Sequence, residues 1–165
     1  MGNSVTTASD NVVVGFEAGQ LMTTANENVL IGANAGETIT TGTRNTIIGS
    51  GAIAGTGGTS VFATVVGREA SATTSSTAVG SGATVSGATG VAVGDQTSVA
   101  STATNGIALG KGAQSTLKGI VGNVAIGSTA NPVSLDQPEE FSAGFNHLNV
   151  TINGNQYYIR LYKDV

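Results

Sequence analysis

The residue types that carry out catalysis are scarce in this sequence and form no recognisable motif. The 165-residue chain has one histidine, His147, and no cysteine, and the neighbours Asn146 and Leu148 complete no catalytic pattern around that histidine. Serine and threonine are abundant, but no general base stands at a fixed spacing from them. We therefore expect a surface or packing role for His147, and a non-enzymatic protein with no catalytic residue, no cofactor and no metal ion.

The composition points to a thin, regular fold. The chain has 25 glycines, 4% aromatic and 10% charged residues, so it cannot build a thick core. A hydrophobic fraction of 39% and a net charge of -4 are nevertheless unlike a disordered chain. The few Lys and Arg are scattered, which argues against nucleic acid as a partner. No apolar run reaches membrane-spanning length, so we expect no membrane insertion.

One short phrase repeats along most of the chain. It reads VVVG at 12–15, VLIG at 29–32, TIIG at 46–49, TVVG at 64–67, TAVG at 77–80, VAVG at 91–94, IALG at 107–110 and VAIG at 124–127. The anchor glycines are spaced by 17, 17, 18, 13, 14, 16 and 17 residues. Each phrase is a short run of β-branched and small residues that ends at a glycine, which predicts a strand followed by a turn. A period near fifteen gives one coil of a β-roll, and eight coils would stack to roughly 38 Å.

Two further positions keep register with the anchor glycine. An alanine stands three residues after it in every repeat except one, where Thr97 takes that place. An asparagine stands four residues before it at Asn11, Asn28, Asn45 and Asn123. We interpret Asn11, Asn28 and Asn45 as a structural ladder of stacked amides. The alternative is a glycan or ion site, which the lack of accompanying acidic residues disfavours.

Side chains along a strand point alternately to its two faces, so each position of the repeated phrase can be assigned to the inner or the outer face. The position before the glycine is predicted to fill the inside of the roll: Val14, Ile31, Ile48, Val66, Val79, Val93, Leu109 and Ile126. The preceding position then points outward, and it is also apolar throughout: Val13, Leu30, Ile47, Val65, Ala78, Ala92, Ala108 and Ala125. An exposed apolar stripe of this length marks an interface, which predicts a homotrimer sharing this stripe. The change from bulky residues to alanine predicts a trimer that is wider in its first half.

The phrases NVVVGFEAG at 11–19 and NVLIGANAG at 28–36 resemble the head repeats of trimeric autotransporter adhesins and the repeats of bacteriophage tail fibres. The resemblance covers about residues 10–131. It implies a left-handed parallel β-roll, a homotrimer, and display on a virion or, alternatively, on a bacterial surface. It also implies a role in attachment to a host receptor, glycan or protein, beside other virion tail proteins, or a role as a rigid spacer. No family binding residue carries over.

The C-terminal part has a different composition. We expect residues 1–9 to be a leader, 10–131 the β-roll, and 132–165 a connector and a β-hairpin that caps the roll or forms its tip. The segments LNVTI at 148–152 and QYYIRLY at 156–162 flank Asn153-Gly154, a strong hairpin signal. The candidate contact residues for a receptor or partner are Tyr157, Tyr158, Arg160 and Tyr162, since Tyr and Arg are enriched at binding hot spots. Alternation puts Tyr158, Arg160 and Tyr162 on one strand face.

Two other classes of protein share features with this sequence. Left-handed β-helix acyltransferases also show aliphatic-Gly steps, but they repeat the step about every six residues, and here it comes once per coil. An ice-binding rod is suggested by the threonine-rich turns at 40–43 and 102–105, although the threonine positions shift from coil to coil. Both alternatives are less consistent with the pattern than an attachment fibre.

Overall fold

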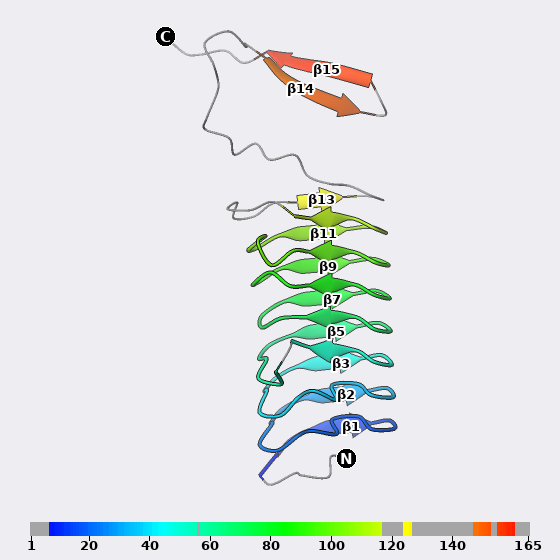
Figure 1. The fold of residues 1–165 in the computed structure, drawn as a ribbon, viewed down its shortest axis with the longest axis vertical. Coiled ribbons are helices and arrows are strands. Elements are labelled where there is room, and N and C mark those ends of the chain that lie inside the picture. The colour runs from blue at the N-terminus through cyan, green and yellow to red at the C-terminus, as the bar shows by residue number, and fades with distance from the viewer. Residues whose placement is uncertain (1–6, 56, 117–123, 127–146, 153–154, 161–165) are drawn as a thin grey trace. The chain divides into compact units, whose positions relative to one another are not determined.

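The fold consists of parallel strands stacked into a β-solenoid (Figure 1). The computed structural model describes residues 7–55 and 57–116 in full, together with the strands at 124–126, 147–152 and 155–160. No helix occurs in these residues, so none of their segments is a helix that could cross a membrane. The chain divides into two compact units, Met1–Val133 and Ser134–Val165.

Every repeated phrase forms one strand of a single eight-stranded parallel sheet. Its strands in order are β1 (Val12–Val14), β2 (Val29–Ile31), β3 (Thr46–Ile48), β5 (Thr64–Val66), β7 (Thr77–Val79), β9 (Val91–Val93), β11 (Ile107–Leu109) and β13 (Val124–Ile126). Equivalent positions pair without slippage, as in Val13 with Leu30 and Leu30 with Ile47. The described residues complete about six turns, because the last of the eight predicted coils extends beyond them.

A second, narrower sheet closes the coil on the other side. It contains β4 (Ile53–Ala54), β6 (Ser71–Ala72), β8 (Thr84–Val85), β10 (Ser98–Val99) and β12 (Gln114–Ser115), again all parallel. The first two coils have no strand here and instead bury Met22 and Ile39. The all-β, parallel solenoid predicted from the repeats is therefore confirmed.

From Gly15 to Gly94 the anchor glycines form a column in which no side chain fits. Gly49 has a φ of 139°, which is in the region that favours glycine. A Cβ added to Gly49 would also lie 2.3 Å from the carbonyl oxygen of Gly67 in the next coil. The glycine thus serves both the turn and the close stacking of coils, and this is why it recurs in every repeat.

The interior of the solenoid holds the central residue of each strand, which is the opposite of the predicted face assignment. The side chains of Leu30, Ile47, Val65, Ala78, Ala92 and Ala108 are all 0% exposed within a single chain. Val13, in the first coil, is half-buried, and the side chain of Ala125 is outside the described residues. A residue enclosed by its own coil cannot contact another copy, so the predicted trimer-interface set is wrong for these core positions.

The residues predicted to fill the roll lie on its outer surface instead. Val14, Ile31 and Val93 are 57%, 37% and 38% exposed. The equivalent Ile48, Val66, Val79 and Leu109 are half-buried, and Ile126 has no described side chain. The physical reason is alternation along the strand: once the central residue of a three-residue strand is enclosed by the coil, both flanking residues point to the outer surface.

Facing strands fill this narrow interior with complementary sizes. In the middle coils Ile47 and Val65 of the long sheet accompany the buried alanines Ala54 and Ala72 of the short sheet. In later coils the sizes are exchanged, because Ala78 and Ala92 accompany the buried Val85 and Val99. The switch to alanine in the repeats therefore reflects packing inside one chain and not the distance of the chains from a shared axis.

The second unit contains an antiparallel hairpin of β14 (His147–Ile152) and β15 (Asn155–Arg160). Leu148 pairs with Ile159, and Ile152 pairs with Asn155 across the turn. This pairing confirms the hairpin predicted from the Asn153-Gly154 signal. The turn itself lies outside the described residues.

Candidate interaction surfaces

The predicted asparagine ladder is present and links the first coils. The Oδ1 atom of Asn11 accepts hydrogen bonds from the N–H and from Nδ2 of Asn28, at 2.9 and 3.0 Å. Asn28 Oδ1 accepts the same pair from Asn45, and Asn45 Oδ1 accepts from the N–H of Ala63 at 2.9 Å. Each Nδ2 also donates to a carbonyl in the turn that comes later in the same coil, as Asn45 does to Ser60 at 2.7 Å. These asparagines therefore stabilise the stack, and their amides face the protein.

The outer face of the long sheet carries two apolar columns. The first contains the residue that opens each strand, and the second contains the residue that closes it. In the fully described coils the first column is Val12, Val29, Thr46, Thr64, Thr77, Val91 and Ile107. The second is Val14, Ile31, Ile48, Val66, Val79, Val93 and Leu109. We call these residues the outer stripe; it contains no charged side chain, and its polar members are the threonines.

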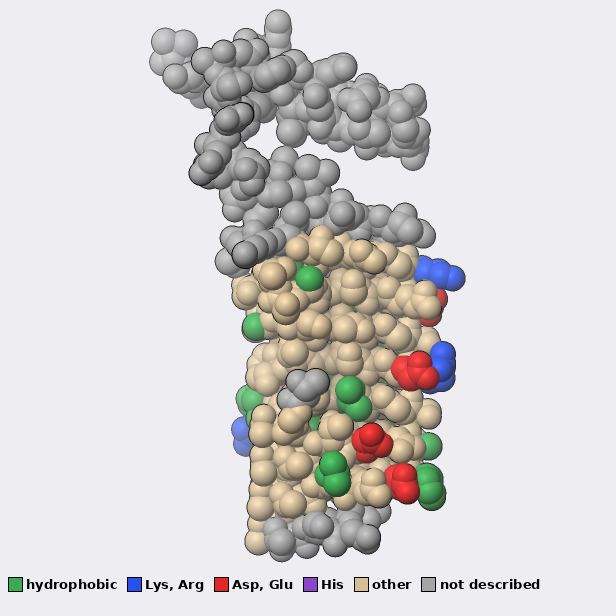
Figure 2. All heavy atoms as spheres, viewed as in Figure 1, with side chains coloured by type: hydrophobic (Ala, Val, Ile, Leu, Met, Phe, Trp, Pro, Cys, Tyr) green, Lys and Arg blue, Asp and Glu red, His purple; other side chains and the backbone are tan. Residues whose placement is uncertain are grey.

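The outer face of the short sheet has the opposite character. Its strands present Ile53, Ser71, Thr84, Ser98 and Gln114 outward, and these are half-buried or exposed. Serine and threonine predominate on it, whereas aliphatic residues predominate on the outer stripe. Figure 2 shows one face of the stack, on which hydrophobic side chains are few and charged ones gather near one edge. The two sheet faces of one coil are thus chemically different along the described stack.

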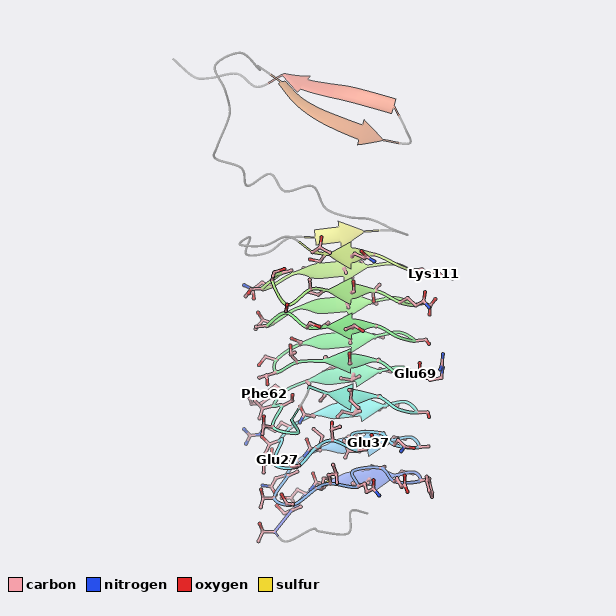
Figure 3. All side chains as sticks on the ribbon, viewed as in Figure 1. Glu27, Glu37, Phe62, Glu69 and Lys111 are labelled. Carbon is pink, nitrogen blue, oxygen red and sulfur yellow. The ribbon has the colours of Figure 1, made fainter. Side chains whose placement is uncertain are left out.

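Charged side chains lie on both turn edges, and Glu37 lies between the two edges (Figure 3). On one edge Arg44 binds the Glu27 carboxylate through Nε at 2.8 Å and lies over the ring of Phe62, 5.5 Å from its centroid. Hydrogen bonding and charge from Arg44 lower the pKa of Glu27 below its usual value. These three residues come from successive coils and have left-handed backbone conformations at the same turn position.

Two further ion pairs lie on the opposite edge, and both are solvent-exposed. Arg68 and Glu69 are 2.6 Å apart, and Lys111 and Asp95 are 3.6 Å apart. Solvent screens such pairs, so they contribute little to stability. Arg44, Arg68 and Lys111 do not converge on one site, since Figure 3 places Glu69 and Lys111 on the edge opposite Glu27 and Phe62.

The residues expected to contact a receptor are only partly described. Tyr157, Tyr158 and Arg160 belong to β15, where Tyr158 pairs with Asn149 and Arg160 with His147. Tyr162 lies outside the described residues. In the part of the chain with described side chains, no cluster of three or more His, Cys, Asp or Glu residues could hold a metal ion.

Comparisons with known proteins give no match: no protein-family model, no curated protein and no solved structure is similar enough to this chain to be reported. The structure therefore defines this chain as a β-solenoid protein. The function of the protein is inferred from the surfaces described above.

Proposed function

We propose that this chain is one third of a homotrimeric, non-enzymatic attachment fibre that is displayed on a virion. The observation that supports this proposal is the outer stripe, which runs along the described stack on the face of the long sheet. Contiguous apolar surface of this extent marks an interface in proteins that are otherwise polar. The fibre either attaches the particle to a host receptor or holds other tail proteins at a fixed distance. Display on a bacterial surface is the alternative setting.

The shape of the stripe favours three copies. Its two columns are separated by two residues of a strand, or about 7 Å, so the stripe is narrow compared with its length. In a parallel trimer each chain can place its first column against the second column of the next chain. Three such contacts form a closed ring around the axis at each coil. In a parallel trimer the same coil of each chain also lies at the same height along the axis. The apolar residues of one coil therefore contact those of the same coil in the other two chains.

The assembly is tested by introducing charge on each sheet face. Val66→Asp and Val79→Asp place carboxylates on the outer stripe, where three would meet near the axis without partners. Thr84→Asp, on the short sheet, is the matched control. Analytical ultracentrifugation should give a trimer for the wild type and the control and a folded monomer for the stripe variants. A wild-type monomer or dimer at micromolar concentration would contradict the proposal.

The attachment role is tested separately on cells. Fluorescently labelled full-length chain should bind host bacteria, and mass spectrometry of purified virions should detect the protein. Tyr158→Ala and Arg160→Ala test whether the hairpin makes the contact, with melting temperature measured in parallel. Loss of thermal stability without loss of binding would assign the hairpin a structural role only.

A further inference from the structure

We propose that the edge of the solenoid directly after the short-sheet strands β4, β6 and β8 carries a binding groove for an uncharged saccharide, located where the coil length changes. This inference rests on the attachment role proposed above and names its ligand class and site. The groove has a volume of about 310 Å³ and is lined by hydroxyl groups of Thr59, Ser60, Thr73, Thr74 and Ser86. That volume lies at the lower end of the range for small-molecule sites, about 300 to 1,000 Å³.

The groove arises from a step in the stack. The coil from Gly49 to Gly67 takes 18 residues, and the next two take 13 and 14, so the longer coil has an extra excursion, of which residues 57–60 are described. The excursion is held firmly, because the Gly58 carbonyl accepts hydrogen bonds from the N–H groups of Thr40, Thr41 and Gly42 at 2.9 to 3.1 Å. A Cβ at Gly58 would lie 2.2 Å from the carbonyl oxygen of Thr38, so only glycine fits there. The wall of the groove is therefore preorganised.

Its polar groups are available to a ligand. Thr59 and Ser86 are exposed, and within the described part of the chain no hydrogen bond involves either hydroxyl. Thr73 Oγ1 donates to the Gly87 carbonyl at 2.9 Å and lies 3.2 Å from Ser76 Oγ, so its orientation is fixed and one lone pair remains as an acceptor. Hydroxyl side chains both donate and accept, as sugar hydroxyls do, so the two sets are complementary.

The groove also offers apolar contact and no charge. A second hollow of about 230 Å³ shares Gly55, Thr73 and Ser86 with the groove and adds the half-buried aliphatic side chain of Ile53. No ionisable side chain lines either hollow. A sugar ring has hydroxyls at its rim and C–H groups on its faces, which matches this mixture, whereas an anionic ligand would find no counter-charge.

The test begins with the full-length protein on an array of neutral oligosaccharides containing glucose, galactose, mannose or N-acetylglucosamine, with sialylated glycans as the charged comparison. Calorimetry with the strongest neutral binder then compares three variants. Thr59→Val with Ser86→Ala should weaken binding at least tenfold, since two hydrogen bonds are removed. Ser86→Trp should abolish binding by filling the groove. Ser50→Ala with Ser81→Ala, on the turn edge that follows Gly49 and Gly80, should leave it unchanged.

The results separate this inference from the attachment role. If no neutral glycan binds, or if binding survives both groove variants, the groove proposal is wrong. Groove variants that still bind host cells would show that attachment occurs elsewhere and would leave the fibre proposal intact. Failure of the wild type to bind cells, together with groove-dependent binding on the array, would instead refute the attachment role and keep the saccharide site.

Discussion

Replacement of Asn28 by alanine is the sharpest test of how the first coils are held together. Asn28 is 0% exposed, and its amide joins three coils. Its Oδ1 accepts from the N–H of Asn45 at 2.9 Å, and its Nδ2 donates to the Gly42 carbonyl at 2.9 Å. Alanine removes both bonds and supplies no replacement.

The magnitude follows from the main-chain groups left without a partner. Each unsatisfied buried group costs about 1–3 kcal/mol, so the loss at the Asn45 N–H and the Gly42 carbonyl predicts a destabilisation of about 2–6 kcal/mol. Asn11→Ala should cost less, because Asn11 lies at the half-buried end of the ladder. The measurement is the free energy of unfolding in urea at one fixed protein concentration.

Asn34→Gly is the matched control. Asn34 has a φ of 58°, which glycine adopts without strain, and its amide bonds to the carboxylate of Glu37 at 2.8 Å near the surface. We expect its free energy of unfolding to stay within about 0.5 kcal/mol of the wild type. If Asn28→Ala is as stable as this control, the ladder does not stabilise the stack and the reasoning fails.

Three further changes test the core and one turn edge. Val65→Ala should lower the free energy of unfolding by about 1.5–3 kcal/mol, and adding Ala72→Val should recover much of it, as measured by a double-mutant cycle in urea. Ile47→Asp should prevent folding, seen as loss of the β-sheet circular dichroism signal, and a folded monomer would contradict its place in the core. Because Arg44 lowers the pKa of Glu27, the melting-temperature advantage of the wild type over Glu27→Gln should be present above pH 4.5 and disappear as the pH falls through the folded-state value. An advantage that is independent of pH would show that this ion pair does not contribute to it.

The sequence predicts the solenoid well because its determinants are local and repeated. The anchor glycine, the β-branched phrase and the Asn at a fixed offset each act within one coil or on the next one, as the pairing of Asn28 with Asn45 shows. The coil length leaves room for a second strand, but the positions of the short-sheet strands could not be predicted, since segments such as Ser71–Ala72 and Ser98–Val99 are too short and too polar to show periodicity.

Alternation alone could not identify the inner face. In β1 and β2 all three strand residues are aliphatic, so either face could be the core. A usable signal was nevertheless present: the central residue shrinks from Val65 to Ala78 where its short-sheet partner grows from Ala72 to Val85. Such compensation is expected between side chains that share one interior, and it identifies the central position as the buried one.

The observed assignment of the inner and outer strand faces also explains why the solenoid combines a thin core with an apolar outer surface. Each described coil encloses few large side chains, and several of the buried ones are alanine. Burying alanine yields little hydrophobic free energy, since the gain scales with the apolar area removed from water. The larger aliphatic groups, such as Val66, Val79 and Leu109, stand on the outer stripe and are only half-buried in one chain. If copies pack through this stripe, much of the hydrophobic stabilisation arises between chains, and the stability of the wild-type fold rises with protein concentration. A stripe variant such as Val66→Asp should therefore have a lower melting temperature as well as a smaller assembly, and its melting temperature should no longer rise with protein concentration.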